Sequence, residues 1–487
     1  MILERTLVVA YLVACIGIGI FASRKVFGSD DEYWVAGRRI GTWVNALAIM
    51  ASLASGGSII GVMGLAYAQG IPATLALFAG AVVGFPLASI LVARPLRRFG
   101  RYTIGDFLVF RYPSRVVELV VPLVIVVAFT IYIVAQLKAV GITAEALLGM
   151  RYDVALVVAT VVFVLYVSFG GMLAITWTDV VQGVLILMVV LGTAAVLLWQ
   201  IGSPFELVRQ ATRAAPALGR VSGEGAASYI GYFVIWATAI PVIPHIVMRV
   251  FTARDPESAR LSLNLAMLAY SVMILAAVLA IVPAGKLDFP ELADADLLFL
   301  RLMESYFPAV VRGIAVAAVL AAVMSTTDAL LLATSSAIAH DLLGRFLTRP
   351  VSGRAGGERQ LALARIVSAW AVGALALYWA LSPPELISRF YTAGIGLLSA
   401  GLFVPTIAGL WWRRANLAGG VASLVGGVAV YVAALTGWLA LPVAPIVAAL
   451  SASAVGMLLF GALGSADGPA MLDEIAALHR DEAAPSA

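Results

Sequence analysis

The sequence is poor in charged residues, cysteine and histidine. Charged residues make up 12% of its 487 residues, whereas soluble domains carry about 25%. Hydrophobic residues make up 62% of the chain. This composition excludes a soluble globular fold. It predicts an all-α polytopic membrane protein that is surrounded by the lipid bilayer.

The scarce residue types also exclude several classes of function. Cys15 is the only cysteine, so no internal disulfide can form. His245, His340 and His479 are scattered, without the spacing of a zinc, haem or nucleophile site. No GxxxxGKS/T motif is present, and a net charge of +4 does not suggest nucleic-acid binding. We therefore expect no enzymatic activity, no cofactor and no nucleic-acid partner.

Long apolar segments recur along the whole chain. A membrane-spanning helix needs roughly 20 apolar residues, and the chain offers a series of segments near that length. They lie near 7–23, 43–69, 73–93, 117–137, 153–170, 176–199, 226–250, 264–284, 306–342, 361–381, 387–412, 416–437 and 441–464. The sequence therefore predicts about 13 transmembrane helices.

The charges that flank these segments predict their orientation. The first segment is followed by Arg24 and Lys25 rather than preceded by a basic region, which is the reverse of a signal peptide. With the N-terminus outside, 21 of the 31 Lys and Arg residues, including Arg249, Arg345 and Arg349, fall on the inner side. An odd number of spans then places the C-terminus in the cytoplasm. We expect a multi-pass protein of the plasma (inner) membrane that works as a monomer.

A cluster of polar residues lies in the apolar segment 306–342. Ser325, Thr326, Thr327 and Asp328 are consecutive, and such groups are costly in hydrocarbon, which makes them candidates for function. The alternative is a bond from each hydroxyl to the carbonyl four residues earlier. Three consecutive hydroxyls followed by a carboxylate favour a binding site.

The spacing within this cluster fits a sodium site. Ala322, Ser325 and Ala329 lie on one helical face, and Thr326 lies one turn beyond Ala322. Hydroxyl and carbonyl oxygens are ligands that membrane helices offer to Na⁺. We expect the Ala322 carbonyl and the hydroxyls of Ser325 and Thr326 to bind the ion. Asp328 stays open as a second-site ligand, a proton carrier or a structural partner.

Two apolar segments are interrupted near their middle. Segment 43–69 contains Ala-Ser-Gly-Gly-Ser at 54–58, and segment 226–250 contains Ala-Ile-Pro-Val-Ile-Pro-His at 239–245. Glycine weakens a helix, and proline removes a backbone donor. The two segments begin two five-helix sets of opposite orientation. Interrupted helices at matching positions of inverted repeats predict a midplane binding site in a secondary transporter.

The first interruption can serve the solute and the ion together. The backbone N–H groups of Gly56, Gly57 and Ser58 would begin a new half-helix and favour a carboxylate. The last carbonyls of the preceding half, at Ala51 and Ala54, favour a cation. The candidate solute-binding residues are Ser55, Gly56, Gly57, Ser58, Gln136 and Trp236.

Two further charged residues lie in or beside apolar segments. Asp179 opens the segment 176–199, where it could be a helix cap or an ion relay, and both alternatives stay open. Together with Asp328 it forms a possible second ion site. Lys138 follows segment 117–137, where we expect it to extend toward the outer interface rather than to bind an anionic solute.

These observations divide the chain into five parts. The parts are an extra N-terminal helix and loop at 1–42, a first inverted repeat at 43–200, a second inverted repeat at 201–412, two peripheral helices at 413–464 and a cytoplasmic tail at 465–487. The tail is short, polar and acidic, and we expect it to be disordered.

Five ordered motifs resemble those of the sodium/solute symporter family. They are YWVAGRRIGTW at 33–43, GRYTIGDFLVFRY at 100–112, FGGMLAITWTDVVQG at 169–183, IPHIVMRVFTARD at 243–255 and AAVMSTTDALLLATSSAIAHDL at 321–342. The resemblance implies a leucine-transporter-like fold with two inverted five-helix repeats. It also implies a sodium site formed by the carbonyls of Ala51, Ala54 and Ala322 with the hydroxyls of Ser325 and Thr326.

The resemblance also bears on a second ion and on the solute. Some relatives bind a second sodium with an Asp that aligns with Asp179, but Asp328 and Ala329 stand here where those relatives have a serine pair. Relatives contact their solute at positions that correspond to Ser55 and Ser58. The runs DEYWVAGR, GRYTIGDF and PHIVMRVFT resemble the acetate/monocarboxylate branch, whereas the 321–342 motif resembles the proline and pantothenate branches. We expect sodium-coupled symport of a monocarboxylate such as acetate. The alternatives are a proline-like amino acid, pantothenate, or a proton-coupled carrier.

Overall fold

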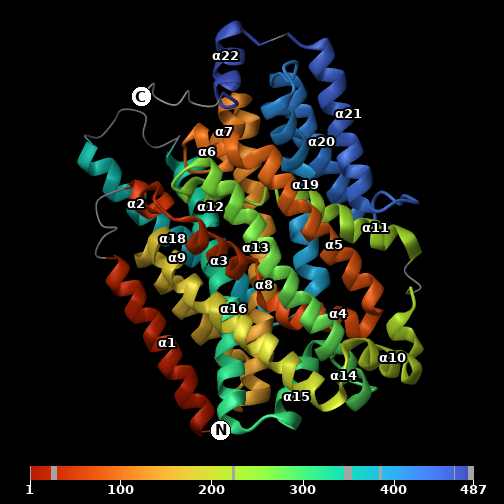
Figure 1. Ribbon diagram of the computed structural model, residues 1–487. Helices are drawn as coiled ribbons and strands as arrows, with labels where there is room; N and C mark the ends of the chain where they lie inside the picture. The colour runs from red at the N-terminus through yellow and green to blue at the C-terminus, as the bar shows by residue number, and fades with distance from the viewer. Residues whose placement is uncertain are drawn as a thin grey trace, which may run out of the picture.

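The computed structural model describes residues 2–23, 30–221, 225–344, 354–382, 386–465 and 467–480. The described residues form helices and contain no β-strand. Figure 1 shows long helices that run between two ends of the molecule, with short helices gathered at each end. The chain starts at the lower end of this view, and its last helix, α22, lies at the upper end. The prediction of an all-α protein is confirmed for the described part of the chain.

The helices follow one another with short connections; η denotes a 3-10 or π-helical segment. They are α1 (Ile2–Ser23), α2 (Asp30–Val35), η1 (Ala36–Arg38), α3 (Thr42–Leu53), η2 (Gly57–Gly61), α4 (Val62–Gln69), α5 (Ile71–Ala88), η3 (Ser89–Ala93), α6 (Arg94–Phe99), α7 (Ile104–Arg111), α8 (Arg115–Leu148), α9 (Tyr152–Ile201), α10 (Pro204–Ala214), η4 (Pro216–Gly219), α11 (Gly225–Ala239), α12 (Pro244–Thr252), α13 (Pro256–Ala276), η5 (Ala277–Ile281), α14 (Val282–Asp288), η6 (Ala295–Leu297), α15 (Leu298–Tyr306), α16 (Ala309–Ser336), η7 (Ala337–Gly344), α18 (Arg354–Ala380), α19 (Ile387–Trp411), α20 (Leu417–Leu435), α21 (Pro445–Leu463) and α22 (Pro469–Ala477).

The predicted spans correspond closely to these helices. Within the described residues, 11 helices are long and apolar enough to cross a membrane, and up to 12 if the bent pair of α3 with η2 and α4 is one span. The predicted span at 153–170 corresponds to the shorter apolar helix Tyr152–Ser168. The segment predicted as 117–137 is longer than expected, because α8 continues to Leu148.

Both predicted interruptions are present. Helix α3 ends at Leu53, Ala54 leaves the helical conformation with ψ 66°, and the next helical stretch is bent by 61° relative to α3. Helix α11 ends at Ala239, and α12 begins at Pro244 after a tight turn. Both breaks therefore lie at the predicted segments: Ala54 leaves the helical conformation just before the glycine pair, and Pro244 begins α12.

A third break, at Gly171, separates the two predicted spans 153–170 and 176–199. The chain of α9 changes direction there, because Gly171 adopts φ 55° and ψ −172°. A side chain at this position would be strained, and a Cβ atom would also lie 3.0 Å from the backbone oxygen of Tyr33. The second half of α9 therefore begins before residue 176, and Asp179 lies two turns inside it. The alternative that Asp179 caps this helix is wrong.

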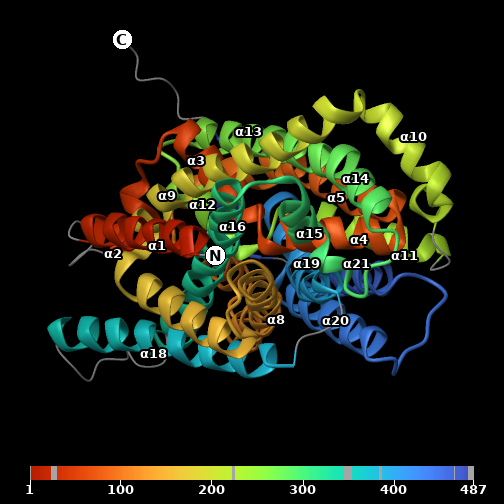
Figure 2. The ribbon, with the colours of Figure 1, turned by 90° about the horizontal axis from the view of Figure 1, so that it is seen from below.

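Helix α16 occupies the centre of the bundle. It packs against α1, α3, α8, α9 and α18, and Figure 2 shows it surrounded by other helices when the bundle is seen along its length. Helix α1, in contrast, exposes a row of large apolar side chains, among them Val9, Val13 and Ile20. Such a face suits a lipid environment. The polar cluster of α16 is thus shielded from lipid by its neighbours.

Helices α6 and α7 lie at the upper end of Figure 1, and they carry Arg94, Arg97, Arg98 and Arg111. Arg24, Lys25, Arg345 and Arg349, which contributed to the expected orientation, lie outside the described residues. Arg249 was counted among the positive charges of the inner side, but its side chain is fully buried in the bundle.

The expectation of a disordered tail is wrong for part of 465–487. Residues 469–477 form helix α22. The tail is held by an ion pair between Asp467 and the buried Arg111, and by hydrogen bonds that tie Leu478 and His479 to the body of the protein.

Candidate functional site

The predicted sodium ligands come together where α16 crosses α3. The Ser325 hydroxyl donates to the carbonyl of Ala51 over 2.9 Å and to that of Ala322 over 3.1 Å. All three residues are fully buried. Hydroxyl and carbonyl oxygens from two helices that are far apart in sequence therefore meet at one point, immediately before α3 breaks.

The neighbouring residues extend this contact. The Thr326 hydroxyl donates to the carbonyl of Ser52 over 2.9 Å. Ala54 is buried and directly follows the last residue of α3. The structure thus brings Ala51, Ala322 and Ser325 into direct contact, and Thr326 bonds to the residue that follows Ala51. Sequence reasoning missed Ser52, the partner of Thr326, because nothing in the spacing distinguishes it from its neighbours.

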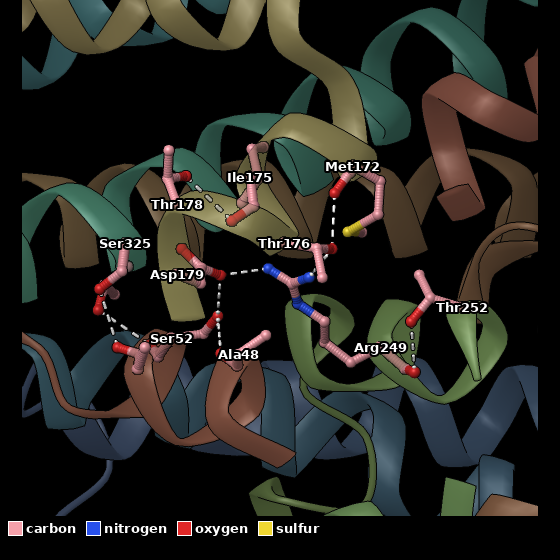
Figure 3. A network of polar contacts seen from close by, with 12 residues as sticks. Ala48, Ser52, Met172, Ile175, Thr176, Thr178, Asp179, Arg249, Thr252 and Ser325 are labelled. Carbon is pink, nitrogen blue, oxygen red and sulfur yellow. Dashed lines mark hydrogen bonds and ion pairs between the residues drawn. The ribbon is translucent and has the colours of Figure 1, made fainter. Parts of the chain in front are cut away.

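Asp179 belongs to a buried charge network that adjoins this contact (Figure 3). Its carboxylate forms an ion pair with the guanidinium of Arg249 on α12, and accepts a hydrogen bond from the Ser52 hydroxyl over 3.1 Å. Arg249 also donates to the Thr176 hydroxyl. Asp179 and Arg249 are both fully buried. Ser52 therefore touches Thr326 through its carbonyl and Asp179 through its hydroxyl, and connects the two groups.

Asp328 has a different environment. It is fully buried on α16, and neither carboxylate oxygen has a hydrogen-bond partner among the described residues. Asp179 is close enough to interact with it electrostatically. The alternative of a structural partner finds no support in the described contacts, since no described side chain donates to Asp328. The two carboxylates that were expected to share an ion site are thus unequal: one is paired with Arg249, and the other is unpaired.

Four of the candidate solute-binding residues, Ser55 to Ser58, line the break between α3 and η2 in the first core helix, which comprises α3, η2 and α4. The Gly56 N–H donates to Oε1 of Gln136 over 3.0 Å, and the Ser58 N–H donates to the Ser55 carbonyl over 2.9 Å. The expectation that these two N–H groups are available to a carboxylate is therefore wrong for this conformation, because the protein itself occupies them. A Cβ atom on Gly57 would lie 2.6 Å from the ring of Tyr391, so only glycine fits there.

Aromatic side chains surround the same break. The Tyr132 hydroxyl donates to Ser55 over 3.3 Å, and the hydroxyls of Ser58 and Tyr270 lie 3.1 Å apart. Tyr391 stacks on Tyr132 with ring centroids 5.4 Å apart, and Trp236 meets Tyr391 edge-on at 5.9 Å. Trp236 therefore reaches the break through Tyr391.

Three of these aromatic residues were missed from the sequence. Tyr132 had one signal, since it lies four residues before Gln136 and so on the same helical face. Tyr270 and Tyr391 lie in long apolar segments and had none.

The expectation that Lys138 extends to the membrane interface is wrong. Its side chain is buried, and its ammonium lies 2.8 Å from the carboxylate of Asp296, which is fully buried. The same carboxylate accepts the N–H of Ile387 at the start of α19. A buried lysine next to a carboxylate is held by that ion pair rather than by the water at an interface.

The sequence and the fold both match known proteins. The family model described as the sodium:solute symporter family matches residues 33–427. The chain belongs to the sodium:solute symporter family. The curated relatives include the osmoregulated proline transporter OpuE of Bacillus subtilis (strain 168), 28% identical, with 86% of each chain covered. They also include the sodium/proline symporter of Escherichia coli (strain K12), 28% identical over 98% of this chain and 96% of the relative. The sodium/pantothenate symporter of the same organism is 29% identical over 94% and 96%.

Solved structures confirm the fold of this symporter-family chain. A Na⁺-coupled sialic acid symporter in a substrate-bound outward-open state matches with a TM-score of 0.78 and 18% identity, over 95% of this chain and 98% of the other. A nucleobase-cation-symport-1 family transporter in a closed conformation matches with a TM-score of 0.54 and 16% identity, over 92% and 94%. The predicted leucine-transporter-like fold is therefore confirmed. The chain is therefore a membrane transporter.

Proposed function

We propose that this chain couples the entry of sodium to the uptake of a small organic solute that carries a carboxylate. A monocarboxylate such as acetate is the first candidate. The observation that carries the proposal is the contact between Ser325 and the carbonyl of Ala51, directly beside the break in the first core helix. Ion ligands and a broken helix at one point are the arrangement through which such transporters join an ion site to a solute site.

The sodium ion would be bound by the carbonyls of Ala51, Ala54 and Ala322 and the hydroxyls of Ser325 and Thr326. In the present conformation both hydroxyls donate to carbonyls. A hydroxyl also carries two acceptor lone pairs. Rotation about the C–O bond can turn an oxygen lone pair toward a cation, so that hydroxyl and carbonyl oxygens face the same ion. Sodium thereby takes the place of hydrogen bonds that now link α3 to α16.

We propose one sodium ion per cycle. Asp179 would be the ligand of a second ion, but its charge is already balanced by Arg249. Removing a buried guanidinium from its carboxylate costs several kcal/mol, which a weakly bound sodium ion does not offset. If a second cation binds, Asp328 is the carboxylate available to it, because Asp328 is unpaired among the described residues.

Two buried hydrogen-bond donors support an anionic group on the solute. Nε2 of Gln136 and Nε1 of Trp236 have no acceptor among the described residues. Both belong to the cluster around the break, and both can only donate. A carboxylate can accept from both, and buried donors are costly when they are left unpaired. The curated relatives that carry proline and pantothenate in their names make those two solutes, each with a carboxylate, the second candidates.

The proposed orientation places the N-terminus outside and the C-terminus in the cytoplasm, with the chain acting as a monomer in the plasma membrane. The arginines around α6 and α7 support it, since positive charge gathers on the cytoplasmic side. A cysteine placed beside α22 in a Cys15→Ala background tests this. If the C-terminus is cytoplasmic, this cysteine should react with an impermeant maleimide added outside intact cells only after the membrane is permeabilised.

Uptake by the purified protein in proteoliposomes tests the function. A labelled panel of acetate, proline and pantothenate is offered with and without an inward sodium gradient. We expect one solute to accumulate only when sodium is present. Equal uptake without sodium, or uptake driven by a proton gradient alone, would contradict the assignment of the coupling ion.

A double variant tests the ion site. Ser325→Ala combined with Thr326→Ala removes two proposed ligands, and we expect the sodium concentration for half-maximal uptake to rise at least tenfold. Thr334→Ala is the matched control, because Thr334 is buried on the same helix and only donates to the carbonyl of Leu330. Unchanged sodium dependence in the double variant would exclude these residues as ligands.

A further inference from the structure

A second cluster of metal-ligating side chains lies away from the transport site. His340 and Asp341 lie in the middle of η7, the helical stretch that follows α16, and Asp106 lies in the first turn of α7. Each offers one ligand atom, and the three atoms lie within 4.8 Å of one another. Asp106 and Asp341 are buried. The side chain of His340 is 28% exposed, which gives solutes access to the cluster.

We propose that Asp106, His340 and Asp341 form a binding site for a divalent transition-metal ion such as Zn²⁺, which ties α7 to η7. Imidazole nitrogen and carboxylate oxygen are both zinc ligands, with bonds of about 2.0–2.2 Å. Nδ1 of His340 lies 2.9 Å from Asp341 and 3.9 Å from Asp106. Ligand atoms around a tetrahedral zinc ion lie roughly 3.3 Å apart on those bond lengths. Small side-chain shifts therefore complete three positions and leave the fourth to water.

The surroundings hold the ligands in place. Asp106 completes a capping box with Thr103: its Oδ2 accepts the backbone N–H groups of Tyr102 and Thr103, while Oδ1 is the oxygen 3.9 Å from His340. The Thr103 hydroxyl donates to both carboxylate oxygens of Asp341. Hydrogen bonds of this kind orient metal ligands and raise affinity.

The imidazole ring is also fixed by its neighbours. Trp34 and Tyr102 meet it edge-on, with ring centroids 6.3 and 5.5 Å away. Gly105 allows α7 to approach, because a Cβ atom there would lie 2.5 Å from Oδ2 of Asp341. In the absence of metal, a hydrogen bond between His340 and Asp341 holds the same atoms together. When a metal binds, the proton of the neutral His340 imidazole moves through solvent from Nδ1 to Nε2, and bonds from Nδ1 and from the Asp341 carboxylate to the metal replace that hydrogen bond.

The site has a consequence for transport that rests on the proposed function, whereas metal binding itself does not. Helix α16 carries Ser325 and Thr326, and the bound metal would fix η7, which continues directly from α16, to α7. Transport requires one group of helices to move relative to another. Zinc supplied on the face on which this cluster opens should therefore slow uptake.

Metal binding by the purified full-length protein tests the site. Zn²⁺ is titrated against a chromophoric chelator, and Co²⁺ is used as a probe whose visible absorption reports tetrahedral coordination. We expect one tight site in the wild type, and at least tenfold weaker binding in His340→Ala and in Asp341→Asn. His479→Ala is the matched control, since His479 lies beside α22 and contacts the carbonyl of Leu410. It should bind as the wild type does.

A variant that fails to fold is distinguished by its thermal unfolding midpoint in the absence of metal. His340→Gln, which keeps a hydrogen-bonding side chain, then replaces His340→Ala. Equal affinity in the wild type and both His340 variants would overturn the site.

Uptake in proteoliposomes, with zinc buffered on one face at a time, tests the consequence for transport. Inhibition of the wild type that is absent in His340→Gln supports it. Tight binding without inhibition would refute the effect on transport while the site stands.

Discussion

At the residue scale, Ser52 connects the proposed sodium site to the buried ion pair between Asp179 on α9 and Arg249 on α12. Its carbonyl accepts from Thr326, and its hydroxyl donates to Asp179. The pair of Asp179 with Arg249 carries two charges that are both fully buried in the bundle. Such a pair contributes little stability relative to apolar side chains, but removal of one partner leaves a charge without compensation.

Asp179→Asn should therefore be strongly destabilising, by about 3–5 kcal/mol, because Arg249 stays buried and charged. The double variant Asp179→Asn with Arg249→Met should recover a large part of the loss, since it removes both charges. Thermal unfolding in detergent measures both.

The exposed pair of Asp153 with Arg151 provides the control for this comparison. Its side chains are 48% and 79% exposed, and exposed pairs contribute about 0–1 kcal/mol. Asp153→Asn should leave the unfolding midpoint almost unchanged. If Asp179→Asn is equally neutral, the buried pair does not stabilise the bundle.

At the element scale, the buried pair of Lys138 and Asp296 joins three parts of the bundle. Lys138 lies on α8, Asp296 on η6, and the N–H of Ile387 at the start of α19 donates to the same carboxylate. These elements meet at the end of the molecule that carries α14 and α15 (Figure 1). If solute enters from this end, the elements must separate, and the ion pair opposes that separation.

Asp296→Asn should shift the protein toward conformations open at this end. In a Cys15→Ala background, a cysteine that replaces the buried Ser388 reports the change, since it reacts with a water-soluble maleimide only when water reaches it. We expect faster labelling in Asp296→Asn. Glu206→Gln, which weakens the exposed ion pair with Arg209 on α10, should leave the labelling rate unchanged. A lower or equal rate in Asp296→Asn argues against a closing role for the pair.

The helices themselves could be predicted, because local chemistry determines them. Long apolar segments mark the spans, and the glycines after Ser55 and the prolines before His245 mark the two breaks. The cluster around Ser325 could also be predicted, because polar side chains are costly in a membrane-spanning helix unless they bind a partner or serve a function. The division between segments 153–170 and 176–199 could be predicted as well. The sequence did not show that the break is confined to Gly171, whose positive φ lets the second helix begin before residue 176.

The partners of charged residues could not be predicted, because they depend on packing between distant segments. Asp296 lies 158 positions after Lys138 in the sequence. It belongs to a connecting segment that has no apolar pattern. Arg249 follows Asp179 by 70 positions, and the pairing needs the Gly171 break as well as the turn before α12. Similarly, the order of the tail around α22 depends on Arg111, which lies far away in sequence.

At the scale of the whole molecule, the solute's charge and the number of ions decide how membrane potential drives transport. One sodium ion moving with a monocarboxylate anion carries no net charge. One sodium ion moving with a zwitterionic amino acid carries one positive charge. The buried charges of Asp179 and Arg249 cancel, so they do not alter this count unless the pair is broken.

This count gives a prediction that distinguishes solutes and stoichiometries. A potential of 100 mV contributes about 2.3 kcal/mol per elementary charge, and tenfold corresponds to about 1.4 kcal/mol. A potassium diffusion potential of 100 mV, negative inside, should therefore raise the equilibrium accumulation of a zwitterion such as proline roughly 40-fold. It should leave the accumulation of acetate unchanged. Vesicles with equal potassium on both sides are the control. A 40-fold effect on acetate would instead require two sodium ions per cycle, and Asp328 would then become the first residue to replace.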